Sequence, residues 1–195
     1  MKSFKPITVL LTSLIAALSS FQILAVETLD SHEHGSANLN IAIDNKVIAI
    51  HFESPAVNII GFEYQPNDEA QRSLISAAKS KLSNFANSYE LQGEPNCLMI
   101  SSSADWVSEH SESEHSESEH SEQDETVGAS LETEHAEFVV EFELQCEQIN
   151  NLTAIDVSLL ALFPAIDEID TQVIYTGGQI KQELTRNNTL IKLMK

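Results

Sequence analysis

The segment Glu109–Glu122 most constrains how this chain can fold, because nothing in it can enter a hydrophobic core. Its sequence, EHSESEHSESEHSE, repeats histidine every five residues at His110, His115 and His120, with only acid and serine between them. A stretch without apolar side chains cannot offset the conformational entropy that folding removes. We therefore expect a disordered insertion at about residues 102–130, with folded chain on either side.

The start of the chain has the layout of a secretory signal peptide. Two lysines precede a short apolar run, residues 7–18, and a more polar stretch leads to Ala25. The run is too short to span a bilayer, so we predict a cleaved signal over residues 1–25. Earlier cleavage after Ser19 or Ser20 and an uncleaved membrane anchor are the alternatives. The mature product should be exported and soluble, without stable membrane insertion.

The charge of the chain limits its partners. It contains 30 acidic and 10 basic residues, a formal net charge of −20. Such a chain repels the phosphate backbone, which excludes nucleic acid as a natural partner, and it is also unsuited to anionic membrane surfaces. The charge favours cations or cationic partner surfaces. The alternative is that acidity only keeps an exported protein soluble.

The chain has two cysteines, Cys97 and Cys146, one on each side of the histidine-acid segment. In an exported protein this pair predicts one disulfide bond and not a thiolate metal site. Closing a loop of this length contributes on the order of 4 kcal/mol in the chain-entropy model. The disulfide would tie the folded parts together across the insertion.

Hydrophobic periodicity predicts an α+β fold in a single domain over residues 26–195, with an antiparallel sheet and two main helices. Alternating residues predict strands at 38–43, 47–52, 97–101, 134–146, 169–175, 179–184 and 189–193, the last three as a meander. Helical spacing predicts helices from 67 or 68 to about 88 and from 150 or 151 to 164, with a further short helix possible at 57–64. The two cysteines can meet if the strands on either side of the insertion are antiparallel neighbours.

The histidine-acid segment has the composition of a metal-attracting tract. Imidazole and carboxylate groups are ligands for divalent transition metals, and zinc in particular binds both. His110, His115 and His120 offer overlapping ligand sets that can hold several ions exchangeably. The alternative is a solvated acidic linker that only happens to contain histidines.

The other four histidines lie in the parts expected to fold or just before them. His32 and His34 point to the same side of an extended segment, so together they can hold one metal ion. His135 lies at the start of the strand that follows the insertion, on its acidic face. It would join His32 and His34 if the N-terminal hairpin lies alongside, and otherwise it is an ordinary exposed histidine. His51 is predicted to be a strand-surface residue and not a ligand.

The sequence contains no catalytic constellation. It lacks a phosphate-binding glycine loop, a His-Glu-x-x-His helix and a nucleophile elbow. Metal-dependent hydrolysis would need three ordered ligands and an open position, and no general base accompanies the candidate ligands. We therefore expect a protein that is not an enzyme.

Several motifs resemble one known family. They are His32–Leu39, Glu53–Glu63, His135 ahead of an aromatic strand that ends in Cys146, Leu162-Phe163-Pro164 and Gly178-Gln179. Together these motifs are similar to the ZrgA-like family of zinc-regulated periplasmic zinc-binding proteins. The similarity covers nearly all of the mature chain, and a His/acid-rich insertion between the two halves is typical of that family.

The resemblance implies a protein of the Gram-negative periplasm that is made under zinc shortage, captures zinc and assists its uptake. The implied partners are zinc ions and a zinc ABC importer or its periplasmic binding protein. The family often has histidine where this chain has Tyr64, so no ligand role is carried to that position. The alternative function is an envelope interaction module without metal, whose acidic arm engages a cationic partner.

Overall fold

The computed structural model of this protein describes residues 33–109 and 135–193, which form two β-sheets and four helices. The strands are β1 (Ser36–Asp44), β2 (Val47–Pro55), β3 (Tyr89–Gln92), β4 (Cys97–Glu109), β5 (His135–Cys146), β6 (Ala154–Val157), β7 (Glu168–Tyr175), β8 (Gly178–Thr185) and β9 (Leu190–Lys192). The helices are α1 (Ala56–Ile60), α2 (Glu69–Leu82), α3 (Phe85–Ser88) and α4 (Leu159–Leu162), and a 3-10 turn, η1, covers Ile149–Asn151.

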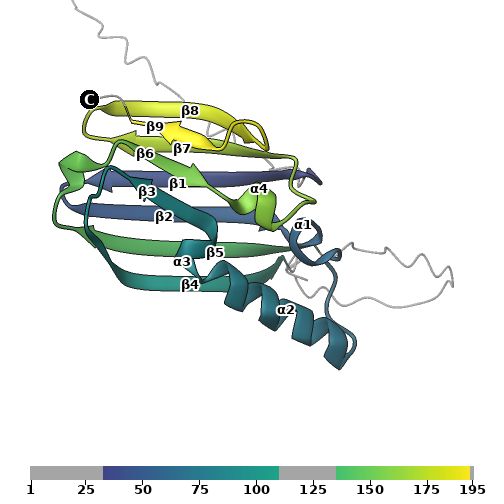
Figure 1. The fold of residues 1–195 in the computed structure, drawn as a ribbon. Coiled ribbons are helices and arrows are strands. Elements are labelled where there is room, and N and C mark those ends of the chain that lie inside the picture. The colour runs from purple at the N-terminus through teal and green to yellow at the C-terminus, as the bar shows by residue number, and fades with distance from the viewer. Residues whose placement is uncertain (1–32, 110–134, 194–195) are drawn as a thin grey trace, which may run out of the picture. The chain divides into compact units, whose positions relative to one another are not determined.

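The core lies between two layers. The larger sheet has the strand order β4-β5-β2-β1-β7-β8, and the smaller sheet has the order β3-β6-β9. The smaller sheet lies over one face of the larger sheet, whereas α1 and α2 lie toward one end of its strands (Figure 1). Phe138 and Phe142 from the larger sheet and Ile155 and Ile191 from the smaller sheet belong to one buried cluster. Burying each of these side chains stabilises the fold by roughly 1.5–3 kcal/mol.

The larger sheet has one apolar and one polar face, as the alternating sequence predicts. In β5 every second residue from Ala136 to Cys146 is buried, whereas Glu141 and Glu143 on the opposite face are exposed. The predicted hairpin of β1 and β2 is confirmed, and Asn45 takes a left-handed conformation in its turn. The polar face of these central strands is therefore available to solvent and ligands.

The expected α+β fold with two main helices is wrong, because the described residues are mostly strand and only α2 is longer than five residues. The first helix was predicted in the right place. Asp68 is its N-cap, and the Asp68 carboxylate accepts a hydrogen bond of 2.8 Å from the Gln71 N–H. The helix ends at Leu82, six residues before the predicted end, and α3 follows as a separate turn.

The second predicted helix, residues 150–164, is replaced by η1, β6 and α4. Leu152, Ile155 and Leu159 have helical spacing, but β6 pairs with β3 on one side and β9 on the other. Ile155 and Val157 are β-branched and fully buried in this small sheet. The backbone pairing available on both sides of β6 therefore outweighs the helical pattern.

The predicted C-terminal meander and the purely antiparallel sheet are also wrong. β7 and β8 form the expected antiparallel pair, but β9 joins β6 in the smaller sheet. A tight turn separates β8 from β9, with the Asn188 N–H donating to the Thr185 carbonyl at 2.9 Å. β7 pairs with β1 in parallel, an arrangement that requires the long connection formed by the segments between them.

β4 and β5 are the two strands on either side of the insertion, and they pair in antiparallel fashion as predicted. The disulfide bond between Cys97 and Cys146 is confirmed and joins one end of this pair, with an S–S distance of 2.01 Å. β4 was expected to end at Ser101 but continues to Glu109, because β5 offers backbone partners along that whole length. At the far end of the pair, Glu109 lies opposite His135.

Two further expectations concern membranes and export. Within the described residues, no helix is both long and apolar enough to cross a membrane. The predicted signal peptide, residues 1–25, lies outside the described residues, as does most of the predicted disordered insertion.

Candidate functional site

The structure brings two of the predicted metal ligands, His34 and His135, to the same end of the larger sheet. His34 precedes β1 and His135 is the first residue of β5. The other predicted ligands lie outside the described residues: His32, His110, His115 and His120. The site can therefore be built from His34 and His135 and from what lies between them.

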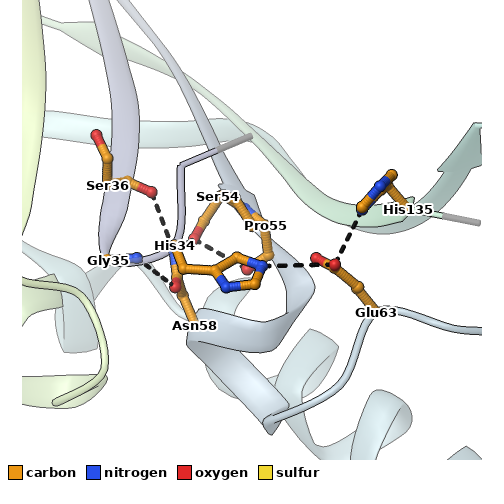
Figure 2. Close-up of polar contacts among 8 residues, drawn as sticks. All are labelled: His34, Gly35, Ser36, Ser54, Pro55, Asn58, Glu63 and His135. Atoms are coloured by element: carbon orange, nitrogen blue, oxygen red, sulfur yellow. Dashed lines mark hydrogen bonds and ion pairs between the residues drawn. The ribbon is translucent and has the colours of Figure 1, made fainter. Parts of the chain in front are cut away.

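Glu63 lies between the two histidines, as Figure 2 shows. Its Oε1 atom lies 2.9 Å from Nδ1 of His135 and 3.5 Å from Nε2 of His34. The Glu63 side chain is 18% exposed, whereas those of His34 and His135 are 64% and 40% exposed. The site is thus a largely buried carboxylate with two more accessible imidazoles on either side of it.

The path of the chain after β2 positions Glu63. Pro55 ends β2, and α1 follows at once. Gly61 ends α1 in the left-handed conformation, with φ of 85°, which a residue without a Cβ atom adopts at little cost. The chain then turns back, and Phe62 packs against Trp106 of β4 with ring centroids 6.0 Å apart. This packing holds the following residue, Glu63, close to β5.

Asn58 of α1 fixes the position of the segment that carries His34. The Asn58 side chain is almost fully buried, and its Oδ1 atom accepts a hydrogen bond of 2.9 Å from the Gly35 N–H. Its Nδ2 group donates to the Ser36 carbonyl at 2.9 Å and to Ser54 Oγ at 3.3 Å (Figure 2). One buried amide therefore ties the start of β1 and the end of β2 to α1, so that His34 is held beside Glu63.

An acidic region adjoins the site at the start of β7. Repulsion from Glu183, followed by desolvation and repulsion from Asp170, Glu33 and Asp167, raises the pKa of Glu168 above its usual value. The Gly35 carbonyl links this region to the His34 turn, since it accepts hydrogen bonds from the backbone N–H groups of Asp167 and Glu168. Crowded carboxylates next to a histidine pair create a negative potential that attracts cations.

The insertion begins and ends at this same site. Glu109 and His135 are opposite each other in the β4–β5 pair, and residues 110–134 connect them. A metal-attracting tract in that position would therefore have both of its ends at the His34–Glu63–His135 cluster.

The distances in the cluster can be compared with those of a zinc site. Two ligands of one tetrahedral zinc ion, each about 2.1 Å from the metal, lie about 3.4 Å apart. The 3.5 Å between His34 and Glu63 fits this separation, whereas the 2.9 Å between His135 and Glu63 is a hydrogen-bond distance. Among the described residues, no three or more histidine, cysteine or acidic side chains are arranged to hold a metal ion as they stand.

Zinc could use the cluster in two ways. Glu63 becomes a ligand if its contact with His135 lengthens by roughly half an ångström. It stays outside the coordination shell if it continues to accept the His135 Nδ1–H bond, an arrangement that commonly orients metal-binding histidines. In addition, the Oε2 atom of Glu63 is buried and has no hydrogen-bond partner among the described residues. A bound cation would compensate the cost of burying that oxygen.

The sequence prediction missed Glu63 and Asn58. Both lie in the Glu53–Glu63 motif that carries the family resemblance, and the motif is the signal that could have identified them. Their roles depend on α1 folding back against the start of β1, which periodicity does not reveal.

Comparison with known protein families identifies the family of this chain. Residues 31–193 match the family described as ZrgA family zinc uptake protein. The chain belongs to this family. The match spans all of the described residues, confirms the family suggested by the motifs, and associates the chain with zinc and its uptake. No curated protein matches the chain.

Proposed function

We propose that this protein is a periplasmic, non-enzymatic zinc-binding protein that captures zinc and assists its uptake under zinc limitation. The ZrgA family match supports the link to zinc uptake. The observation that carries the capture step is the Glu63 carboxylate between His34 and His135, with a buried oxygen that lacks a partner among the described residues.

Release is as important as capture in such a role. His34 is 64% exposed, so one side of the bound ion remains accessible to an acceptor protein or to another ligand. The acceptor in this proposal is a zinc ABC importer or its periplasmic binding protein. His110, His115 and His120 would collect zinc in the tract that begins and ends at the site. Because zinc binds the unprotonated imidazole, acid should weaken both kinds of binding.

Zinc titration of the purified mature protein, in competition with a chelator, tests the proposal. Replacing both His34 and His135 with alanine should lower the affinity for the most tightly bound zinc ion by more than about 100-fold. Even the loss of a residue that only orients a ligand lowers metal affinity by about 10–100-fold. Glu63→Gln should also lower the zinc affinity, and Glu90→Gln, an exposed change in the smaller sheet, is the matched control.

The tract is tested separately by replacing its three histidines with asparagine. This variant should bind fewer zinc ions in total and keep the tightest one. If the intact protein does not bind zinc at micromolar or lower concentrations, the proposed capture role is wrong. If zinc binds but the His34 and His135 replacements leave the tightest affinity unchanged, capture takes place elsewhere in the chain.

Growth under zinc limitation tests the uptake role. Cells that lack the protein should grow poorly with a zinc chelator and recover with the intact chain but not with the double histidine variant. Recovery with the double variant would contradict a role of this site in uptake.

A further inference from the structure

A second cluster, formed by His51, Glu53 and Glu141, lies on the polar face of the larger sheet, away from the His34 site. His51 is in the middle of β2, opposite Asn40 of β1 and Glu141 of β5. These three residues, together with Glu143 and Gln172, line a hollow in that face. The hollow is thus formed by central strands whose backbone pairing fixes the face and register of each residue.

Both ring nitrogens of His51 face carboxylates. Nε2 lies 2.7 Å from Oε1 of Glu53, which is a short hydrogen bond. Nδ1 lies 3.5 Å from Oε1 of Glu141, which is too far for a good hydrogen bond. The side chains of His51 and Glu53 are about one third exposed, and that of Glu141 is two thirds exposed.

These two distances suit two different roles in a metal site. The 3.5 Å between Nδ1 and Glu141 is close to the roughly 3.4 Å that separates two ligands of one tetrahedral zinc ion. When Nε2 carries the proton, its bond to Glu53 fixes the ring and leaves Nδ1 free to accept a metal. A carboxylate on the far side of a ligating imidazole is a common arrangement at metal sites.

We propose that His51 and Glu141 form a second, independent divalent-metal site on the polar face of the sheet, with Glu53 as the positioning residue. With two protein ligands, the remaining coordination positions belong to water. The imidazole favours zinc and similar transition metals over magnesium or calcium, which prefer oxygen ligands alone. The open hollow and the small ligand number make this a site of weaker, exchangeable binding.

The cluster differs from an ordinary surface histidine, which the sequence predicted at this position. An ordinary strand histidine does not need a carboxylate near each of its ring nitrogens. Here the register sets Glu141 directly opposite, and the period of two brings Glu53 to the same face. Because the pairing of β2 with β5 fixes the backbone at these positions, the ligands need little backbone rearrangement to bind an ion.

Imidazole NMR of the mature protein tests the proposal. The background variant has His34 and His135 replaced by alanine and His110, His115 and His120 replaced by asparagine, so that His51 and His32 are the remaining histidines. In long-range 1H–15N spectra, Nδ1 of His51 should shift on zinc addition. The signal is assigned by its loss in His51→Gln. Circular dichroism shows that the background variant is folded, and the same titration of the chain with all its histidines serves as the reference.

Three further variants in this background separate the roles. Glu141→Gln should weaken zinc binding at His51 by more than tenfold, and Glu53→Gln should weaken it about 10–100-fold. Glu90→Gln, which removes one exposed charge from β3 of the smaller sheet, should leave it unchanged. The proposal is overturned if the His51 ring does not respond to millimolar zinc, if Nε2 shifts in place of Nδ1, or if Glu90→Gln weakens binding as much as Glu141→Gln. Because the first cluster is absent from the background, none of these outcomes depends on the proposed function.

Discussion

The two clusters contain the same kinds of side chain in opposite arrangements. At the end of the sheet, one carboxylate, Glu63, lies between two imidazoles, whereas on the polar face one imidazole, His51, lies between two carboxylates. The first carboxylate is largely buried and reaches its place through a helix and a turn. The second cluster is on regular strands and is more open to solvent.

The difference indicates different uses of the same ligand types. A buried carboxylate oxygen without a partner among the described residues is poorly solvated unless a cation binds, which favours tight binding. An open strand site is held rigidly but remains hydrated, which favours weak and rapid exchange. The first cluster also depends on loop geometry, so it should be sensitive to changes that leave the second cluster intact.

The largest expected effect concerns the scaffold that both clusters share. Replacing Cys97 and Cys146 with alanine should lower the free energy of unfolding by about 4 kcal/mol, because the disulfide closes a loop with a sequence separation of 49. Urea unfolding measures this loss. The bond lies at the opposite end of the β4–β5 pair from His135, so the zinc affinity of the folded variant should not change. A large loss of affinity in the folded variant would show that the disulfide controls the site.

A smaller effect should distinguish the two clusters. Asn58→Ala removes a buried amide that holds the His34 segment. The free energy of unfolding, measured in urea, should therefore fall by about 1–3 kcal/mol. The substitution should also weaken zinc binding at the first cluster and leave the His51 response unchanged. The control is Asn87→Ala at an exposed position, for which the expected change is within about 0.5 kcal/mol. Equal zinc losses at both clusters would mean that Asn58 acts on the whole fold.

A change in the turn before Glu63 should cause a smaller loss of stability. Gly61→Ala should cost about 1–2 kcal/mol, because a Cβ atom is strained at φ of 85°. Among the described residues, no atom lies within 4 Å of the added Cβ, so the expected cost is that of the backbone conformation. Gly61→Asn should cost less, since asparagine tolerates this conformation better. An asparagine variant as unstable as the alanine variant would contradict this explanation.

The smallest effect concerns the acidic region beside the first cluster. The pKa of Glu168 is raised, so its ionised form is destabilised in the folded state and stability falls as pH rises through that pKa. Glu168→Gln should therefore raise the midpoint of urea unfolding slightly at pH 7. The difference should vanish at pH values well below ~4.3, where the carboxyl is protonated in both states. A destabilised variant at pH 7 would mean that Glu168 makes a favourable contact.

Local patterns were sufficient to predict much of the fold. The hairpin of β1 and β2, the alternation in β5, the start of α2 and the Cys97–Cys146 bond all follow from the order of nearby residues or from the number of cysteines. The failures involve choices between partners far apart in the sequence. Ile155 and Val157 form a strand because β3 and β9 are available, and β9 pairs with β6 and not with its neighbour β8.

The same limit applies to the candidate site. His34 and His135 could be identified from residue type and position, and their meeting was conditional on an arrangement of strands. Glu63 could not be assigned a role, because its place depends on α1 and on the Asn58 hydrogen bonds that hold β1. His51 was predicted to lie on the strand surface and does so, but the register that sets it opposite Glu141 is not visible in the sequence.

The most direct test of the central claim is the location of zinc in crystals of the zinc-loaded mature protein by anomalous scattering at the zinc edge. The expected result is a peak about 2.0–2.2 Å from a nitrogen of His34 and a nitrogen of His135, with Glu63 either at ligand distance or hydrogen-bonded to the second nitrogen of His135. Zinc bound elsewhere, with the cluster empty and the contact between Glu63 and His135 still 2.9 Å, would contradict it.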